Sequence, residues 1–75
     1  MVRLAVNRVM GEREAVGPTV LVIEGPKVTN MYALQHEEAF TIWLDGFVLL
    51  KNIDGELTAW RDNKQMIEGQ WPLLS

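Results

Sequence analysis

The chain contains no cysteine and a single histidine among its 75 residues. The absence of cysteine excludes disulfides, thiolate-bound metals and a cysteine nucleophile. The one histidine, His36, precedes Glu37 and Glu38, but one imidazole beside two carboxylates in an exposed connection is an incomplete zinc site. We therefore expect no metal site and no cofactor.

Motifs for nucleotide binding and covalent catalysis are also missing. Gly11, Gly17 and Gly25 form neither a GxGxxG nor a Walker sequence. No serine has a histidine and an aspartate in a constrained setting, so nucleophilic catalysis has no support in the sequence. The sequence predicts a protein that is not an enzyme and that has no catalytic residues.

Positive charge is scarce, because the formal net charge of the chain is −3. Non-specific affinity for nucleic acid depends on a positive field, which this balance does not provide. Arg3, Arg8 and Arg13 are the candidates for a local basic patch, although such arginines are usually solvated surface charge. Nucleic-acid binding by these arginines, with exposed aromatic side chains, is therefore the alternative function, and a protein is the expected partner.

Long apolar runs are absent as well. No run approaches the about 20 residues that a membrane-spanning helix requires. The first ten residues also lack the apolar core of a signal peptide. We therefore expect a soluble, cytoplasmic protein with no membrane partner.

What the chain has in plenty is apolar surface. Hydrophobic residues make up 48% of the sequence and include three tryptophans. A chain of this length forms one domain, residues 1–75, and buries only about 60% of the surface that it exposes when unfolded. Because such a core is marginal, we expect a homo-oligomer that buries part of the apolar surface between subunits.

The first half of the chain reads as strands separated by turns. Val2 to Val9 alternates apolar and polar residues, as a half-buried strand does. Met10 to Pro18 is polar and contains glycines, so we expect an exposed loop. Thr19 to Ile23 is a nearly continuous β-branched run, which predicts a second strand that ends at Gly25-Pro26.

The segment between Lys27 and Glu38 has two interpretations. Apolar residues at every second position favour a strand over residues 28–34. A possible cap at Asn30 and apolar residues at helical spacing favour instead a short helix over residues 30–38. We prefer the strand, and the helix would change the fold class to α+β.

Asp45-Gly46 stands between two apolar runs, and this dipeptide in such a place is the strongest short-range signal for a hairpin. It predicts a type I′ turn that joins strands over residues 40–44 and 47–51. Asn52 to Gly55 then predicts a type I turn with a G1 bulge, followed by a third strand over Glu56 to Arg61.

This three-strand arrangement predicts one cross-strand row on each face, formed by Trp43, Val48 and Trp60 and by Ile42, Leu49 and Ala59. Since residues 47–50 are all apolar, both faces need cover, from the N-terminal hairpin, from the tail of residues 66–74 or from another subunit. The expected fold is a mostly antiparallel β protein, a small SH3-like or OB-like barrel or meander sheet.

Large aromatic and apolar side chains are the candidates for partner binding. Trp43 and Trp60 on one sheet face are expected in the core, although Trp60 is also a candidate contact. Trp71 beside Pro72 in a terminal segment is the better anchor. The predicted partner-binding residues are Trp71, Leu73, Tyr32 and Trp60. They fit a small regulator or inhibitor, of the kind that phages also make, which docks on a larger protein.

Overall fold

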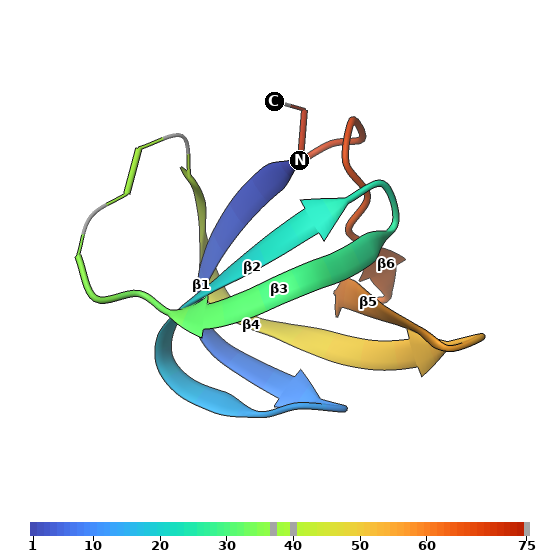
Figure 1. The fold of residues 1–75 in the computed structure, drawn as a ribbon, viewed down its shortest axis with the longest axis horizontal. Helices are drawn as coiled ribbons and strands as arrows, with labels where there is room; N and C mark the ends of the chain where they lie inside the picture. Colours follow the sequence, from blue (N-terminus) through green and yellow to red (C-terminus); the bar gives the residue numbers. More distant parts are fainter. Residues whose placement is uncertain (37, 40, 75) are drawn as a thin grey trace.

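The computed structural model describes residues 1–36, 38–39 and 41–74, and its regular elements there are all β-strands (Figure 1). Their bounds are β1 Val2–Gly11, β2 Ala15–Glu24, β3 Lys27–Ala33, β4 Thr41–Ile53, β5 Glu56–Arg61 and β6 Lys64–Gln65. The mostly-β expectation is confirmed. The preferred strand over residues 28–34 is found as β3, and no helix occurs over the described part of residues 30–38. No described segment is a helix long and apolar enough to cross a membrane.

The strands form a single mixed sheet in the order β3-β2-β1-β4-β5-β6. β1 lies in its centre, antiparallel to β2 and parallel to β4. The expectation of an antiparallel meander is therefore wrong at this pair. The reason lies in β1 itself, since Leu4, Ala5 and Val6 are all buried, and a strand buried on both faces belongs in the middle of a sheet.

The sheet curls, but it does not close into the expected barrel. β3 and β5 come close together in space, yet they are not hydrogen-bonded neighbours (Figure 1). One amide on β3 is already occupied, because the N–H of Met31 donates to the Oδ1 of Asn30 over 2.9 Å. The side chain of Asn30 therefore competes with a neighbouring strand for this N–H.

Asp45-Gly46 is not a hairpin turn, which corrects the prediction made for it. β4 runs through both residues as one strand along β1, with Val6 opposite Leu44 and Arg8 opposite Phe47. Two residues of β4 therefore face one residue of β1, and Gly46 takes a φ of 88° at this irregularity. Pairing along both halves of β4 holds the chain extended, and Gly46 supplies a bulge.

The two-residue hairpin turns lie further along the chain. Asp54 and Gly55 have φ values of 53° and 83° between the paired residues Ile53 and Glu56. This is a type I′ turn, so the predicted type I turn with a bulge is wrong, while the strand Glu56–Arg61 is confirmed. Asp62-Asn63 forms a second turn with positive φ at both residues and connects β5 to β6.

The observed pairing of β4 with β5 differs from the cross-strand rows expected from the sequence. Leu49 lies opposite Trp60 and Leu50 lies opposite Ala59, so Val48 and Trp60 are on different faces. Val48 is buried in the core, whereas Trp60 is half-buried on the outer side. The alternation of β1 also shifts at Asn7, which is why Val6 and Val9, three residues apart, both belong to the core.

The core lies inside the curl of the sheet, and the C-terminal segment closes one end of it. Met66 and Leu73 from this segment are buried with the inward residues of the strands. The N–H of Gly25 donates to the Oε1 of Glu68 over 2.9 Å, and the N–H of Glu68 donates to the carbonyl of Gly25 over 2.9 Å. The bond from Gly25 and the nearby N-terminal ammonium lower the pKa of the Glu68 carboxyl below its usual value.

Candidate functional site

A group of apolar side chains stands on the convex, outer side of β1, β2, β4 and β5. Cross-strand pairing places them in adjacent rows, since Arg8 lies between Val16 and Phe47, and Leu49 lies between Met10 and Trp60. Trp43, opposite Ala5, extends the group along β4. We call this group the outer apolar face, and its members are Met10, Val16, Trp43, Phe47, Leu49 and Trp60.

The side chains of this face are unusually open to solvent for their size. Trp43 and Phe47 are each 53% exposed, and Val16 is 87% exposed. Single exposed apolar residues are common, but several large apolar side chains exposed on the same side of a sheet mark an interaction surface. The expectation that Trp43 lies in the core is wrong, because its side chain is exposed on the outer side of β4.

Trp60 is held in a fixed orientation on this face. Its Nε1–H donates to the Oγ1 of Thr58 over 2.8 Å, and that hydroxyl donates to the carbonyl of Lys51 over 2.8 Å. The Nζ of Lys51 lies 4.5 Å from the centroid of the Trp60 ring, which is a cation–π contact. A rigid aromatic anchor loses little conformational freedom when a partner covers it.

The charged side chains that lie among the residues of the outer apolar face are positive. Arg8 is exposed beside Phe47, and Lys51 covers one side of Trp60. Asp62 lies at the margin, where it lines a shallow recess of about 180 Å³ together with Phe47 and Trp60. The face therefore combines an aromatic centre with a local positive charge that contrasts with the acidic chain as a whole.

The structure does not unite the predicted partner-binding residues. Trp60 belongs to the outer apolar face, whereas Trp71 is 69% exposed on the C-terminal segment. Leu73 is fully buried and offers no surface to a partner. Tyr32 is half-buried on β3, and its hydroxyl donates to the Oε1 of Glu38 over 2.8 Å. This hydrogen bond raises the pKa of Tyr32 above its ordinary value, with burial as a second cause.

The sequence does not identify Trp43 and Phe47 as surface residues. The loop expected over Met10 to Pro18 is shorter than predicted, because β1 extends to Gly11 and β2 begins at Ala15 and carries Val16 on its outer side. The available signal was the run of residues 47–50, which is apolar on both faces. A chain of 75 residues has too few residues to cover both faces of a sheet, so an apolar run on both faces indicates that one face is an exposed contact surface.

The three arginines of the alternative interpretation do not form one patch. Arg3 and Arg8 are five residues apart on β1, about 16 Å along an extended strand. The Nη1 of Arg3 lies 3.5 Å from the Oε1 of Glu38, which partly neutralises it. Arg13, beyond the end of β1, lines a different surface. Of the three, Arg8 alone lies within the outer apolar face.

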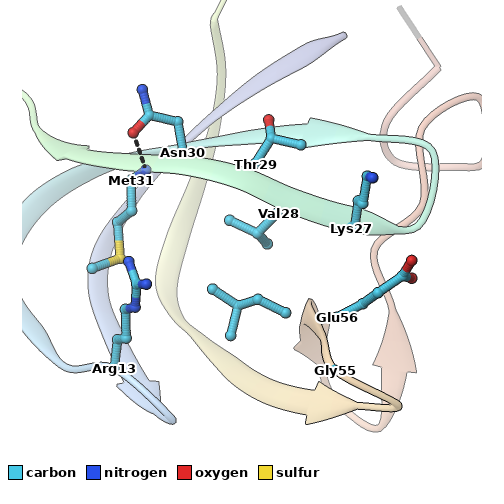
Figure 2. A pocket seen from close by; sticks show the side chains of 9 residues that line it. Arg13, Lys27, Val28, Thr29, Asn30, Met31, Gly55 and Glu56 are labelled. Atoms are coloured by element: carbon cyan, nitrogen blue, oxygen red, sulfur yellow. Dashed lines mark hydrogen bonds between the residues drawn. The ribbon is translucent and has the colours of Figure 1, made fainter.

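Arg13 borders a groove of about 470 Å³ between β3 and the turn from β4 to β5 (Figure 2). Lys27, Thr29, Asn30 and Glu56 give this groove a polar lining, and Val28 points into it. The side-chain oxygen of Asn30 accepts a hydrogen bond from the backbone N–H of Met31, so it is already engaged within β3. The groove therefore contains mixed charges without an acid–base pair in contact.

Within residues 1–36, 38–39 and 41–74, no three histidine or acidic side chains gather in a way that holds a metal ion. His36 is exposed, and Glu37 lies outside the described residues, as does Phe40. Comparison with known protein families, curated proteins and solved structures finds no match for this chain.

Proposed function

We propose that this protein is a small non-enzymatic interaction module that docks on a larger protein through the outer apolar face. The single observation that carries the proposal is the group of Trp43, Phe47 and Trp60 at the surface of one sheet face. A few central anchors supply most of the binding energy in protein interfaces, and aromatic residues are enriched among them.

The charge of the face indicates the chemistry of the partner. Arg8 and Lys51 are the cations among the aromatic residues. A partner with an apolar patch and acidic residues around it complements this arrangement, and complementary charge steers association and excludes wrong partners. Glu12, Glu14 and Asp62 are exposed and lie among the charges that tune partner choice.

A regulatory or inhibitory role suits this arrangement. The apolar face occupies the convex side of a sheet whose core is built separately on the concave side. Covering the face therefore requires no rearrangement of the fold, and docking of a preformed surface keeps the entropy loss on binding low. Self-association through the same face is the other way to cover it, and the experiment below separates the two.

One observation favours a second candidate, binding of single-stranded nucleic acid. Phe47 and Trp60 present aromatic surfaces on which bases stack, and Arg8 and Lys51 lie directly beside them. Such binding weakens steeply as salt is added, because cations on the protein release counterions from the phosphates. Protein docking remains our proposal because Arg3 and Arg13 do not extend the positive patch.

The test compares two variants of the face, Phe47→Ala and Trp60→Ala, with Leu74→Ala, which removes an exposed apolar side chain elsewhere. The partner is captured from cells of the source organism and purified, and its Kd is measured. We expect each face variant to weaken binding by about 30-fold, equivalent to about 2 kcal/mol, and the control to bind like the wild type.

Sedimentation of the isolated protein runs alongside. A dimer that the two face variants abolish identifies a second copy of the chain as the occupant. Salt-sensitive binding to an oligonucleotide that Arg8→Gln weakens supports the nucleic-acid alternative. A monomeric protein whose partner binds both face variants as tightly as the wild type would refute docking through this face.

A further inference from the structure

A second cavity, separate from the outer apolar face, lies where the hairpin of β5 and β6 meets the C-terminal segment. It measures about 420 Å³, and its lining residues are Leu44, Arg61, Asp62, Lys64, Met66, Trp71 and Pro72. We call it the Arg61 pocket. Its walls are mainly apolar, and its polar groups are concentrated on the hairpin.

The guanidinium of Arg61 is the group that points to a ligand. Its Nη1 is buried and has no hydrogen-bond partner among the residues that the structure describes. The Nη2 lies close to β4, because a Cβ on Gly46 would be 3.9 Å from it. A buried charged donor without an acceptor costs more than an ordinary missing hydrogen bond, so such groups normally have an acceptor from the protein, a water molecule or a bound anion.

Lys64 provides an independent indication. It pairs directly with Arg61 across the two strands, and the turn at Asp62-Asn63 holds them opposite each other. Two cations in directly opposite positions repel each other and destabilise the hairpin. The Nζ of Lys64 lies 5.7 Å from the centroid of the Trp71 ring, on the side of the pocket. An anion bound between the two cations removes this repulsion.

The net charge of the pocket is positive. Arg61 and Lys64 are two cations, and Asp62 is the one carboxylate in the lining. The remaining walls come from Leu44, Met66, Trp71 and Pro72 and bind apolar groups. Pockets for small ligands combine such walls with a few polar groups that fix orientation, within roughly 300 to 1,000 Å³.

We propose that the Arg61 pocket binds a small organic anion that joins a carboxylate to an apolar body. The carboxylate accepts hydrogen bonds from Arg61, whose planar fork matches its two oxygens, and lies close to Lys64. The apolar body lies against Met66 and Trp71. This site is distinct from the docking face, so the proposal stands whether or not the protein has a protein partner.

The test is a titration of the purified protein with octanoate, followed by the NMR signals of the tryptophan indole and arginine Nε–H groups. We expect saturable shifts at Trp71 and Arg61. Octanol, which lacks the charge, and acetate, which lacks the apolar body, should each bind at least tenfold more weakly. Octanoate should also raise the thermal midpoint, since a ligand that binds only the folded state stabilises it.

Variants locate the site. Arg61→Met should weaken octanoate binding at least tenfold, whereas Arg13→Met, which removes an exposed cation outside the pocket, should leave it unchanged. Arg61→Lys retains the charge, and it should bind with intermediate affinity if Arg61→Met fails to fold. The proposal is overturned if octanoate causes no saturable shift in the wild type, if acetate binds as well as octanoate, or if every Arg61 variant that folds binds like the wild type.

Discussion

The outer side of the sheet has two halves that differ in what lies over them. In the half where the outward residues of β1, β2 and β3 are neighbours, Ala5 and Val20 are fully buried, although they do not belong to the main core. In the half formed by β4 and the beginning of β2, Trp43, Phe47 and Val16 are exposed. The strands alternate in the same way in both halves, so alternation alone does not decide burial.

The connection from β3 to β4 is attached to the first of these halves. Its Glu38 accepts the hydrogen bond of Tyr32 and lies 3.5 Å from Arg3, on the outer side of the first half. The N–H of Leu34, at the start of this connection, donates to the carbonyl of Pro18 over 3.0 Å. Glu38 and Leu34 therefore attach this connection to β1, β2 and β3, whereas Trp43 and Phe47 on β4 remain exposed.

The sharpest test of this contrast uses two valines on the same side of β2. Val20 is fully buried and Val16 is 87% exposed. Val20→Ala removes two buried methyl groups and should lower the free energy of unfolding by about 2 kcal/mol. Val16→Ala should change it by less than about 0.5 kcal/mol. Urea unfolding of both variants measures the difference, and equal losses would contradict the division into covered and open halves.

A smaller effect on stability is expected where the connection from β3 to β4 is attached to β3. Tyr32→Phe removes the hydrogen bond to Glu38 and keeps the ring, so it should lower the free energy of unfolding by about 1 kcal/mol. Glu38→Gln retains an acceptor for the hydroxyl and should lose less. Both values come from denaturant unfolding. A Phe variant as stable as the wild type would show that this bond does not hold the connection in place.

The alkaline titration of Tyr32 gives the smallest signal and the most local one. Tyr32 is the single tyrosine of the chain, so the phenolate absorbance at about 295 nm reports it alone. The bond to Glu38 raises its pKa in the folded state above the ordinary value of about 10. The stabilising contribution is therefore complete below pH 10 and is lost as the pH rises through the folded pKa. Glu38→Gln should return the titration toward the ordinary value, and an unchanged midpoint would argue against this contact.

Two Asp-Gly dipeptides show how far the sequence alone predicts this fold. At Asp54-Gly55 the dipeptide forms a type I′ turn, and at Asp45-Gly46 it forms a bulge within a strand. The dipeptide is the same at both sites, so the difference comes from β1, which lies beside Asp45-Gly46 and pairs with β4 before and after it. Long-range pairing of this kind leaves no mark in the neighbouring sequence.

The strand expected over residues 28–34 followed from alternation, and the strand over residues 56–61 followed from the turn residues before it, and both signals are local. The parallel pair of β1 and β4 did not, since it joins residues that are far apart in the chain. Of the residues expected to bind a partner, Trp60 stands on the outer side of the sheet, within the proposed docking face. Phe47 and Trp43 were missed because the hairpin assigned to Asp45-Gly46 placed their strand in the wrong register.

The contact of Gly11 with β4 limits how the hairpin end of β1 can evolve. A Cβ at Gly11 would lie 2.2 Å from the carbonyl oxygen of Leu50, and its φ is 102°. Every other amino acid would push the two backbones apart at the point where the N–H of Glu12 donates to that same oxygen over 2.9 Å. Position 11 therefore does not tolerate substitution. Insertions are better tolerated at the exposed tip of residues 12–14, where an additional module or epitope can be grafted without changing the contact between Gly11 and β4.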